Sequence, residues 1–227
     1  SGAGLMKPMD ELKAGFEARY KIPVRLIYVG SGELFGMIAT RKAGDVFIPG
    51  AEKYVKDATK KGMARAEGQR SVCYHVPIIL VPAGNPGNVQ SLQDLARPGV
   101  RVALADAKAA AIGKVANAIL KKNSLMEQVS GNVVVRPSTT NQLLIYTATR
   151  QVDACIAWED QATWGEAKGK VQIVRIPAAQ NAIKTIPSAV VTYSKQADKA
   201  QMFVDYIASP EGKTLWQKWG FPINKPE

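Results

Sequence analysis

Residues 100–122 have the sequence VRVALADAKAAAIGKVANAILKK, which contains three local patterns in order. The apolar and β-branched residues 100–104 predict a buried strand, and residues 105–108 predict a loop. In residues 109–122 apolar side chains recur at steps of three and four, which predicts an amphipathic helix. A strand, a loop and a helix in this order form the repeating unit of an α/β protein.

The same order of patterns recurs on both sides of this segment. Residues 24–29 predict a strand that runs into the turn 30–32 and a further helix. Residues 133–136 predict another strand, followed by a capped helix start at 137–140. Further helices are predicted at 5–20, 54–61, 197–208 and 210–219, and further strands at 45–48, 154–158, 171–176 and 188–192. The sequence therefore predicts an α/β fold throughout.

Composition limits the class of protein. Of the 227 residues, 46% are hydrophobic and 22% are charged, so the chain can form both a packed core and a solvated surface. The longest apolar stretch, at 76–83, is far shorter than the roughly 20 residues that span a bilayer, and we expect a soluble chain. The net charge of +11 favours an anionic partner. Because the basic residues are spread along the chain, we expect no nucleic-acid partner.

The domain organisation is predicted from the absence of a linker. No polar, Pro/Gly-rich connector divides the sequence, so two lobes would have to be joined by ordered strands. The apolar stretches 76–81 and 186–191 are the candidates for these crossings. We predict a discontinuous first lobe of residues 1–78 plus 188–227 and a second lobe of residues 79–187.

Four predicted helix starts are rich in small or hydroxyl residues. They lie at residues 2–4, 30–32, 109–113 and 138–140. A helix start offers unpaired backbone N–H groups and the positive end of the helix dipole, which together bind oxyanions without an opposing charge. An ordinary cap or turn is the simpler explanation of any one of them. Their joint occurrence favours an oxyanion site.

Residues that could support catalysis or bind a metal are sparse. His75 is the one histidine and lies close to Cys73, but no third ligand or orienting acid is identifiable for either a metal site or a nucleophile pair. Glu159 and Asp160 could hold a metal, although acids at a helix start are also favoured by the dipole. We therefore predict no catalytic residue, no metal site, no cofactor and no enzyme. A disulfide between Cys73 and Cys155 is left open.

Five motifs occur in an order that resembles the periplasmic molybdate-binding proteins of ABC importers. They are GAGL at 2–5, VGSGEL at 29–34, GDVFI at 44–48, DACIAW at 153–158 and GFPI at 220–223. The resemblance covers nearly the whole chain. It implies a class II periplasmic binding fold, in which two α/β lobes joined by two crossing strands close on a tetrahedral oxyanion held by neutral hydrogen bonds. It also implies a strand before residue 2, which lies upstream of this sequence if the chain has it.

By position, the resemblance implies five ligand-binding residues. They are Gly4, Ser31, Ile112, Thr140 and Trp158, with Ile112 and Thr140 contributing their amides. The chain departs from the family at Gly4, where the family usually has a serine, and at Trp158, where it usually has a tyrosine. The next residue is usually small in the family and is Glu159 here. Two hydroxyl donors are thereby absent. The indole N–H or the nearby Lys108 could substitute for them, and we place Lys108 and Glu159 beside the ligand.

The function implied by the resemblance is that of a non-enzymatic receptor. Its ligand would be molybdate or tungstate, with sulfate given nearly equal weight, and it would deliver that anion to a membrane permease. We expect a monomer located in the periplasm or outside the cell, with or without a lipid anchor. Two alternatives stay open. The same fold could bind a small carboxylate, a phosphate ester or a metal species, or it could be a sensory ligand-binding domain.

Overall fold

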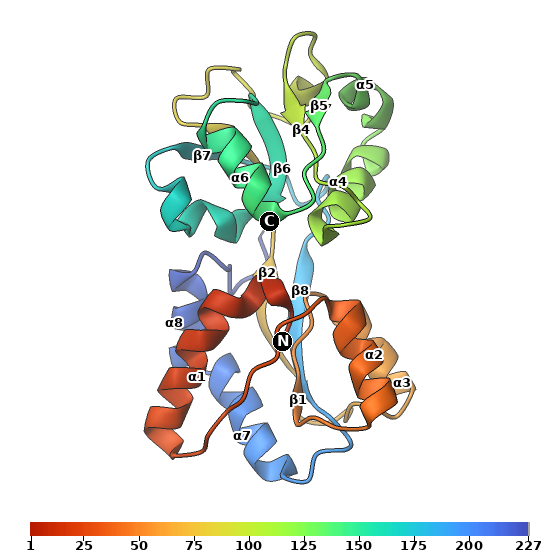
Figure 1. Ribbon diagram of the computed structural model, residues 1–227, viewed down its shortest axis with the longest axis vertical. Helices are drawn as coiled ribbons and strands as arrows, with labels where there is room; N and C mark the ends of the chain where they lie inside the picture. Colours follow the sequence, from red (N-terminus) through yellow and green to blue (C-terminus); the bar gives the residue numbers. More distant parts are fainter. Residues whose placement is uncertain (227) are drawn as a thin grey trace. The chain divides into compact units, whose positions relative to one another are not determined.

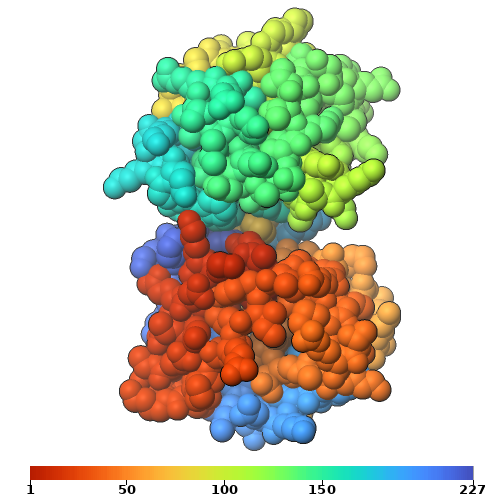
Figure 2. Space-filling model, in the orientation of Figure 1, coloured from red at the N-terminus to blue at the C-terminus, as the bar shows by residue number. Residues whose placement is uncertain are grey.

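The structure, a computed structural model, describes residues 1–226 and divides into two compact units. Unit 1 comprises Ser1–His75 and Lys184–Lys225, and unit 2 comprises Val76–Ile183 together with Pro226. Figure 2 shows the N-terminal part, in red and orange, and the later part, in light blue, on the surface of the same unit. The chain crosses from unit 1 to unit 2 after His75 and returns after Ile183. The sequence predicted these two boundaries at 78/79 and 187/188, which are three and four residues closer to the C-terminus than those of the structure.

Unit 1 is a three-stranded antiparallel sheet with helices on both sides (Figure 1). In sheet order the strands are β1 (Val46–Phe47), β8 (Lys184–Val190) and β2 (Arg70–His75). The helical elements are η1 (Ala3–Leu5), α1 (Met6–Tyr20), α2 (Ser31–Arg41), α3 (Glu52–Lys60), α7 (Ala197–Ala208) and α8 (Pro210–Lys218). One core, with Phe16 and Trp216, lies under α1, α7 and α8; a second, with Leu34 and Phe47, lies under α2 and α3.

The predicted strand at residues 24–29 is wrong. Its side chains alternate between half-buried and exposed, as they would in a strand, but the only bridge in this segment is a parallel one between Gly2 and Val29. A strand needs a hydrogen-bonded neighbour along its length. Within residues 1–226, no neighbouring strand accompanies residues 22–26.

Unit 2 is a five-stranded mixed sheet in the order β5-β4-β6-β3-β7. The strands are β3 (Pro77–Pro82), β4 (Val102–Ala103), β5 (Val133–Val135), β6 (Ala154–Trp158) and β7 (Val171–Arg175). The helical elements are η2 (Gln93–Ala96), α4 (Ala111–Lys122), α5 (Met126–Gly131), α6 (Thr140–Ala148), η3 (Glu159–Thr163) and η4 (Gly165–Ala167). Strands β3 and β6 are buried along their whole length, so both faces of the sheet are covered.

The mixed α/β architecture confirms the predicted fold class. Helix α7 has the predicted bounds, and α4 begins two residues later than predicted. Helix α5 was not predicted, and β8 begins earlier in the chain than expected. No helix within the described residues combines the length and the apolar character that crossing a membrane requires.

Candidate functional site

In unit 2, three predicted site residues follow three adjacent strands. Strand β4 runs parallel to β5 on one side and to β6 on the other, so the carboxyl ends of all three strands meet at one edge of the sheet. The predicted site residue that follows β4 is Ile112, and the one that follows β5 is Thr140. The last residue of β6 is Trp158. The loops after β4 and β5 are joined directly, because the amide of Asp106 donates to the carbonyl of Pro137 at 2.8 Å. Ligands of α/β proteins bind at such an edge.

Thr140 and Trp158 are held together by a residue that the sequence did not single out. Oε1 of Gln161 accepts from the amide of Trp158 at 3.1 Å, and Nε2 donates to the carbonyl of Thr140 at 2.6 Å. The Gln161 side chain is completely buried. A glutamine three residues into a helical turn commonly reaches back to the start of that turn, and this spacing was the available signal.

The starts of α4 and α6 present unpaired amides. No side chain caps α4, and within residues 1–226 the amides of Ala111 and Ile112 have no hydrogen-bond partner. In α6, Thr139 Oγ1 accepts from the amide of Gln142 at 3.2 Å, which leaves the amides of Thr140 and Asn141 without a partner in the same range. Both starts carry the positive end of a helix dipole. The edge can therefore bind an anion through backbone groups alone.

Gly113 brings the first turn of α4 against the loop after β4. A Cβ at this position would lie 2.4 Å from the carbonyl oxygen of Ala105 and 2.8 Å from the amide nitrogen of Ala107. Only a glycine allows so close an approach. The Ile112 side chain is buried, so this residue offers the site its backbone.

We expected Glu159 and Lys108 beside the ligand, and the two differ in burial and in hydrogen-bond partners. Glu159 is 9% exposed, and its Oε1 pairs with Arg175 Nη2 at 2.7 Å. This hydrogen bond raises the pKa of Arg175. The other oxygen, Glu159 Oε2, is buried and has no partner among the described residues. Lys108 is exposed, and its amide donates to Asp106 Oδ1 at 2.7 Å.

In unit 1, Ser31 is the centre of a small cluster of backbone groups. Its Oγ accepts from the amide of Gly50 at 2.9 Å, which leaves the hydroxyl hydrogen to donate elsewhere. Gly2 lies against the same group, since a Cβ there would be 3.3 Å from the amide nitrogen of Gly50. Helix α2 starts at Ser31 without a side-chain cap, and its first amides have no partner within residues 1–226.

Gly4 has a different neighbour. A Cβ on Gly4 would meet His75 Cε1 at 3.8 Å, and no other atom of the described residues beyond its chain neighbours would lie within 4 Å. The amide of Gly4 has no hydrogen-bond partner in the described part of the chain. The His75 ring is buried and packs on Phe221 with centroids 5.4 Å apart.

The remaining candidates are the two cysteines and the residues that could hold a metal. Cys73 and Cys155 are both buried, and no disulfide joins them. Burial raises the pKa of the Cys155 thiol to about 12, which keeps it protonated and unreactive. Among residues 1–226, no three His, Cys, Asp or Glu side chains are grouped so that they could hold a metal ion.

Residues 1–222 match the family model described as bacterial extracellular solute-binding protein. The chain belongs to this family. The solute-binding protein is 28% identical over 221 residues to the "Putative binding protein" of Haemophilus influenzae, covering 97% of this chain and 88% of that one. It is 25% identical over 215 residues to the molybdate-binding protein ModA of Mycobacterium tuberculosis, covering 93% and 77%.

A solved structure supports the same assignment of fold. The "substrate binding domain of putative molybdenum ABC transporter from Clostridium difficile" matches this solute-binding protein with a TM-score of 0.85 at 18% identity, covering 99% of this chain and 96% of that one. The class II periplasmic binding fold and the resemblance to molybdate-binding proteins, both predicted from the sequence, are confirmed.

Proposed function

We propose that this solute-binding protein captures a tetrahedral oxyanion, molybdate or tungstate first and sulfate next, and delivers it to the permease of an ABC importer. The observation that carries this proposal is the pair of helix starts in unit 2, where the amides of Ile112 and Thr140 have no acceptor among residues 1–226. Buried or half-buried N–H groups are costly to leave unpaired, so an anion that accepts from them is bound favourably.

Donors of unit 1 take part in the proposed binding as well. Ser31 supplies its hydroxyl hydrogen and its amide, and Gly4 supplies its amide. Trp158 contributes from the carboxyl end of β6. These groups are neutral, so selectivity depends on how many donors reach the anion and on the size of the space for it. The net charge of +11 attracts anions at long range and so raises their concentration near the protein, although the charged side chains need not contact the bound anion.

We propose binding without catalysis. A reaction would need a nucleophile or a base that can reach the bound molecule. Cys155 is buried and protonated, and His75 packs against an aromatic ring. The role is then that of a carrier located outside the cytoplasmic membrane, as in the family to which the chain belongs.

Titration calorimetry tests the proposed ligand. The protein is unfolded, dialysed free of anions and refolded, and is then titrated with molybdate, tungstate, sulfate and phosphate. Saturable binding of molybdate and tungstate, at least about tenfold tighter than that of phosphate, is the expected result. Absence of heat and of any thermal stabilisation with molybdate, tungstate and sulfate would contradict the proposal.

One observation favours a second class of ligand. Glu159 Oε2 is buried next to Trp158 and has no partner in the described residues. A carboxylate oxygen with free lone pairs suits a ligand that carries a hydrogen-bond donor, such as a protonated phosphate ester. Glycerol phosphate in the same titration tests this candidate. Binding that weakens from pH 6 to pH 8, and that loses this dependence in Glu159→Gln, would support it.

A further inference from the structure

Most of the positive charge of the protein belongs to unit 1. This unit contains 19 Lys and Arg against 11 Asp and Glu, and the net charge of the whole chain is +11. Some of its cations are neutralised by neighbouring carboxylates. Arg19 pairs with Glu211 at 2.9 Å, and Lys56 pairs with Glu52 at 3.0 Å. The unneutralised cations therefore lie elsewhere in the unit.

The loop that follows β8 holds two other loops at one end of the sheet of unit 1. Val191 donates its amide to the carbonyl of Asp45 at 2.9 Å, and Thr192 donates its amide to the carbonyl of Met63 at 3.0 Å. Ser194 Oγ donates to Asp45 Oδ1 at 2.6 Å. The loops after α2 and α3 are thereby fixed beside the loop after β8, at the end of the sheet that β8 runs toward.

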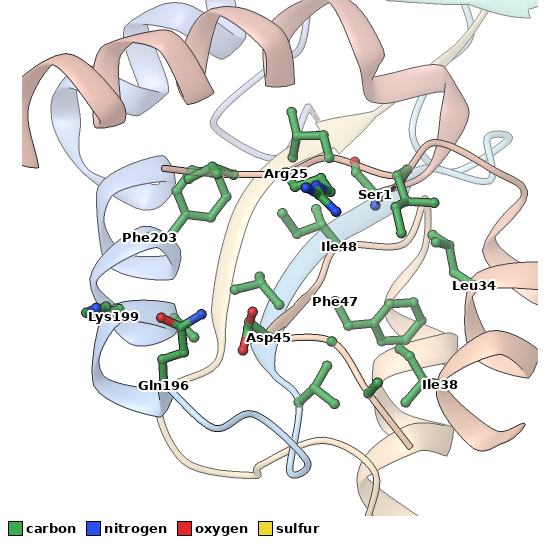
Figure 3. Close-up of a pocket in the computed structure, with 18 of the residues that line it drawn as sticks. Ser1, Arg25, Leu34, Ile38, Asp45, Phe47, Ile48, Gln196, Lys199 and Phe203 are labelled. Carbon is green, nitrogen blue, oxygen red and sulfur yellow. Dashed lines mark hydrogen bonds between the residues drawn. The ribbon is translucent and has the colours of Figure 1, made fainter. Parts of the chain in front are cut away.

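Six exposed basic residues, which we call the basic end of unit 1, lie on these loops and on the helix ends beside them. They are Arg41, Lys42, Lys61, Arg65, Lys195 and Lys199. Within residues 1–226 none of the six has an ion pair. Figure 3 shows Lys199 on the side of a cavity in unit 1 that lies away from Ser1, together with Gln196 and Asp45.

Helix dipoles explain only part of this pattern. Cations are favoured at the C-terminal ends of α2 and α3, which suits Arg41, Lys42 and Lys61. Lys195 lies just before α7 and Lys199 lies in its first turn, where the positive end of the dipole disfavours a cation. A partner with negative charge would offset that cost.

The arrangement fits a broad anionic surface better than a small anion or a nucleic acid. A small anion needs donors that converge on one point, whereas these side chains come from separate loops. A single-stranded nucleic acid needs exposed aromatic side chains on which its bases stack. The aromatic residues here, Phe35 and Tyr193, are half-buried and pack against the core under α2 and α3. The headgroups of anionic lipids form a broad anionic surface.

Helix α2 separates the basic end from a candidate anion donor. It begins at Ser31 and ends at Arg41, and its 11 residues span about 15 Å. Strand β1 gives the same separation, since Asp45 precedes it and Gly50, which donates to Ser31 Oγ, follows it. A partner at the basic end therefore need not cover Ser31.

We propose that the basic end of unit 1 binds the surface of a bilayer that contains anionic lipids. Each lysine or arginine near such a surface adds to the attraction, and the six together hold the protein there reversibly. Because the contact depends on exposed charges, salt weakens it. It concentrates the protein at the bilayer through a surface that is separate from the candidate anion site.

Co-sedimentation with lipid vesicles tests this proposal. Vesicles of equal parts phosphatidylglycerol and phosphatidylcholine are compared with vesicles of phosphatidylcholine alone, at about 0.05 M and about 0.5 M salt. We expect binding to the anionic vesicles at low salt, loss of most of this binding at high salt, and no binding to the neutral vesicles. Absence of binding to the anionic vesicles at low salt would overturn the proposal.

Two triple variants separate the basic end from the net charge of the whole protein. The first carries Arg65→Gln, Lys195→Gln and Lys199→Gln. The second removes three charges from exposed positions of unit 2 through Lys121→Gln, Lys168→Gln and Lys170→Gln. We expect the first to lower the vesicle partition coefficient by at least about tenfold and the second by less than about threefold. Both should keep the Tm and circular dichroism of the unmodified protein, because the replaced side chains are exposed.

Two results with these proteins would contradict the proposal. Equal losses in the two triple variants would mean that net charge, and not the basic end, drives the binding. Tighter binding of the unmodified protein to polyglutamate than to the anionic vesicles, at equal concentration of negative charge, would assign this surface to an acidic polypeptide instead.

Discussion

Gln161 donates a hydrogen bond of 2.6 Å from Nε2 to the carbonyl oxygen of Thr140. The same side chain accepts from the amide of Trp158. A single buried amide group thus ties the end of β6 to the first residue of α6. It holds the carbonyl of Thr140, while the amide of Thr140 has no partner in the part of the chain that the structure describes. An anion site at this helix start requires that arrangement.

Gln161→Glu should damage both stability and anion binding. The substitution keeps the size of the side chain but replaces the donor with a carboxylate oxygen that faces the carbonyl of Thr140. We expect the free energy of unfolding to fall by about 1–3 kcal/mol. A negative charge near the free amides should weaken oxyanion binding by at least about tenfold. Urea unfolding and calorimetry measure the two effects.

Gln172→Glu is the matched control, since it makes the same chemical change on an exposed position of β7. It should leave stability and binding nearly unchanged. If Gln161→Glu binds molybdate as tightly as the unmodified protein does, the edge formed by β4, β5 and β6 is not the anion site.

Thr140→Pro isolates the contribution of one amide. Thr140 is the first residue of α6, where proline is tolerated, and the preceding Thr139 has an extended backbone (φ −130°, ψ 154°) that is compatible with a following proline. The substitution removes the N–H and retains the helix. We expect affinity for the anion to fall by about tenfold or more, as for loss of one charge-assisted hydrogen bond.

Thr140→Ala is the control for this pair, because it removes the side chain and keeps the amide. Its affinity should stay within about threefold of the unmodified value if the backbone is the donor. Calorimetric titration with molybdate and circular dichroism of all three proteins provide the comparison. An alanine variant that binds as weakly as the proline variant would assign the contact to the hydroxyl instead, because both substitutions remove it.

The sequence predicted the helices and the buried strands well, because periodicity reports which face of an element is buried. The spacing of Met9, Leu12 and Phe16 predicted α1, and the apolar run before Trp158 predicted β6. The same local patterns placed Ile112 and Thr140 at helix starts. These predictions depend on residues that are close together in the sequence, and the predicted elements are present in the structure.

Features that depend on a distant partner were not predictable in the same way. Residues 24–29 have the composition of a strand, yet hydrogen-bonded neighbours decide whether a strand forms, and these residues have one bridge only. Gln161 is an ordinary polar residue in the sequence. It matters because folding places it beside Thr140, which is 21 residues away along the chain. No local pattern of residue types encodes that proximity.

Gly113→Ala should destabilise unit 2 and weaken binding together. The new Cβ would lie 2.4 Å from the backbone oxygen of Ala105, so the first turn of α4 must move away from the loop after β4. We expect a loss of about 1–3 kcal/mol in the free energy of unfolding, as for other overpacked sites. Displacement of the Ile112 amide should lower affinity for the anion as well.

Gly36→Ala, in unit 1, should increase stability, whereas Gly113→Ala should decrease it. Gly36 lies within α2, and a Cβ there would meet no atom of residues 1–226 within 4 Å apart from the neighbouring backbone of the helix. Alanine should therefore raise stability by about 0.5–1 kcal/mol, since it reduces the entropy of the unfolded chain. Thermal and urea unfolding of both variants test the pair. A stable Gly113→Ala that binds normally would show that α4 does not need this close approach.

Asp153→Asn should weaken the junction between the starts of β4 and β6 in a way that depends on pH. Asp153 Oδ2 accepts from the amide of Arg101 at 2.8 Å, and Oδ1 pairs with Arg101 Nη2 at 2.8 Å. The hydrogen bonds with Arg101 lower the pKa of Asp153 in the folded protein. A lowered carboxyl pKa stabilises the fold above the unfolded value of about 4, and this contribution is lost as the pH falls through the folded pKa.

We therefore expect Asp153→Asn to cost about 1–2 kcal/mol at pH 7, because the backbone contact weakens and the ion pair is lost. The difference from the unmodified protein should shrink progressively below about pH 4, where the aspartate becomes protonated and resembles the asparagine. Urea unfolding at pH 7, 5 and 3.5 measures it. Glu67→Gln, at an exposed position of unit 1, should show no such dependence. A cost for Asp153→Asn that is the same at all three pH values would mean that packing, and not the charge of Asp153, maintains this junction.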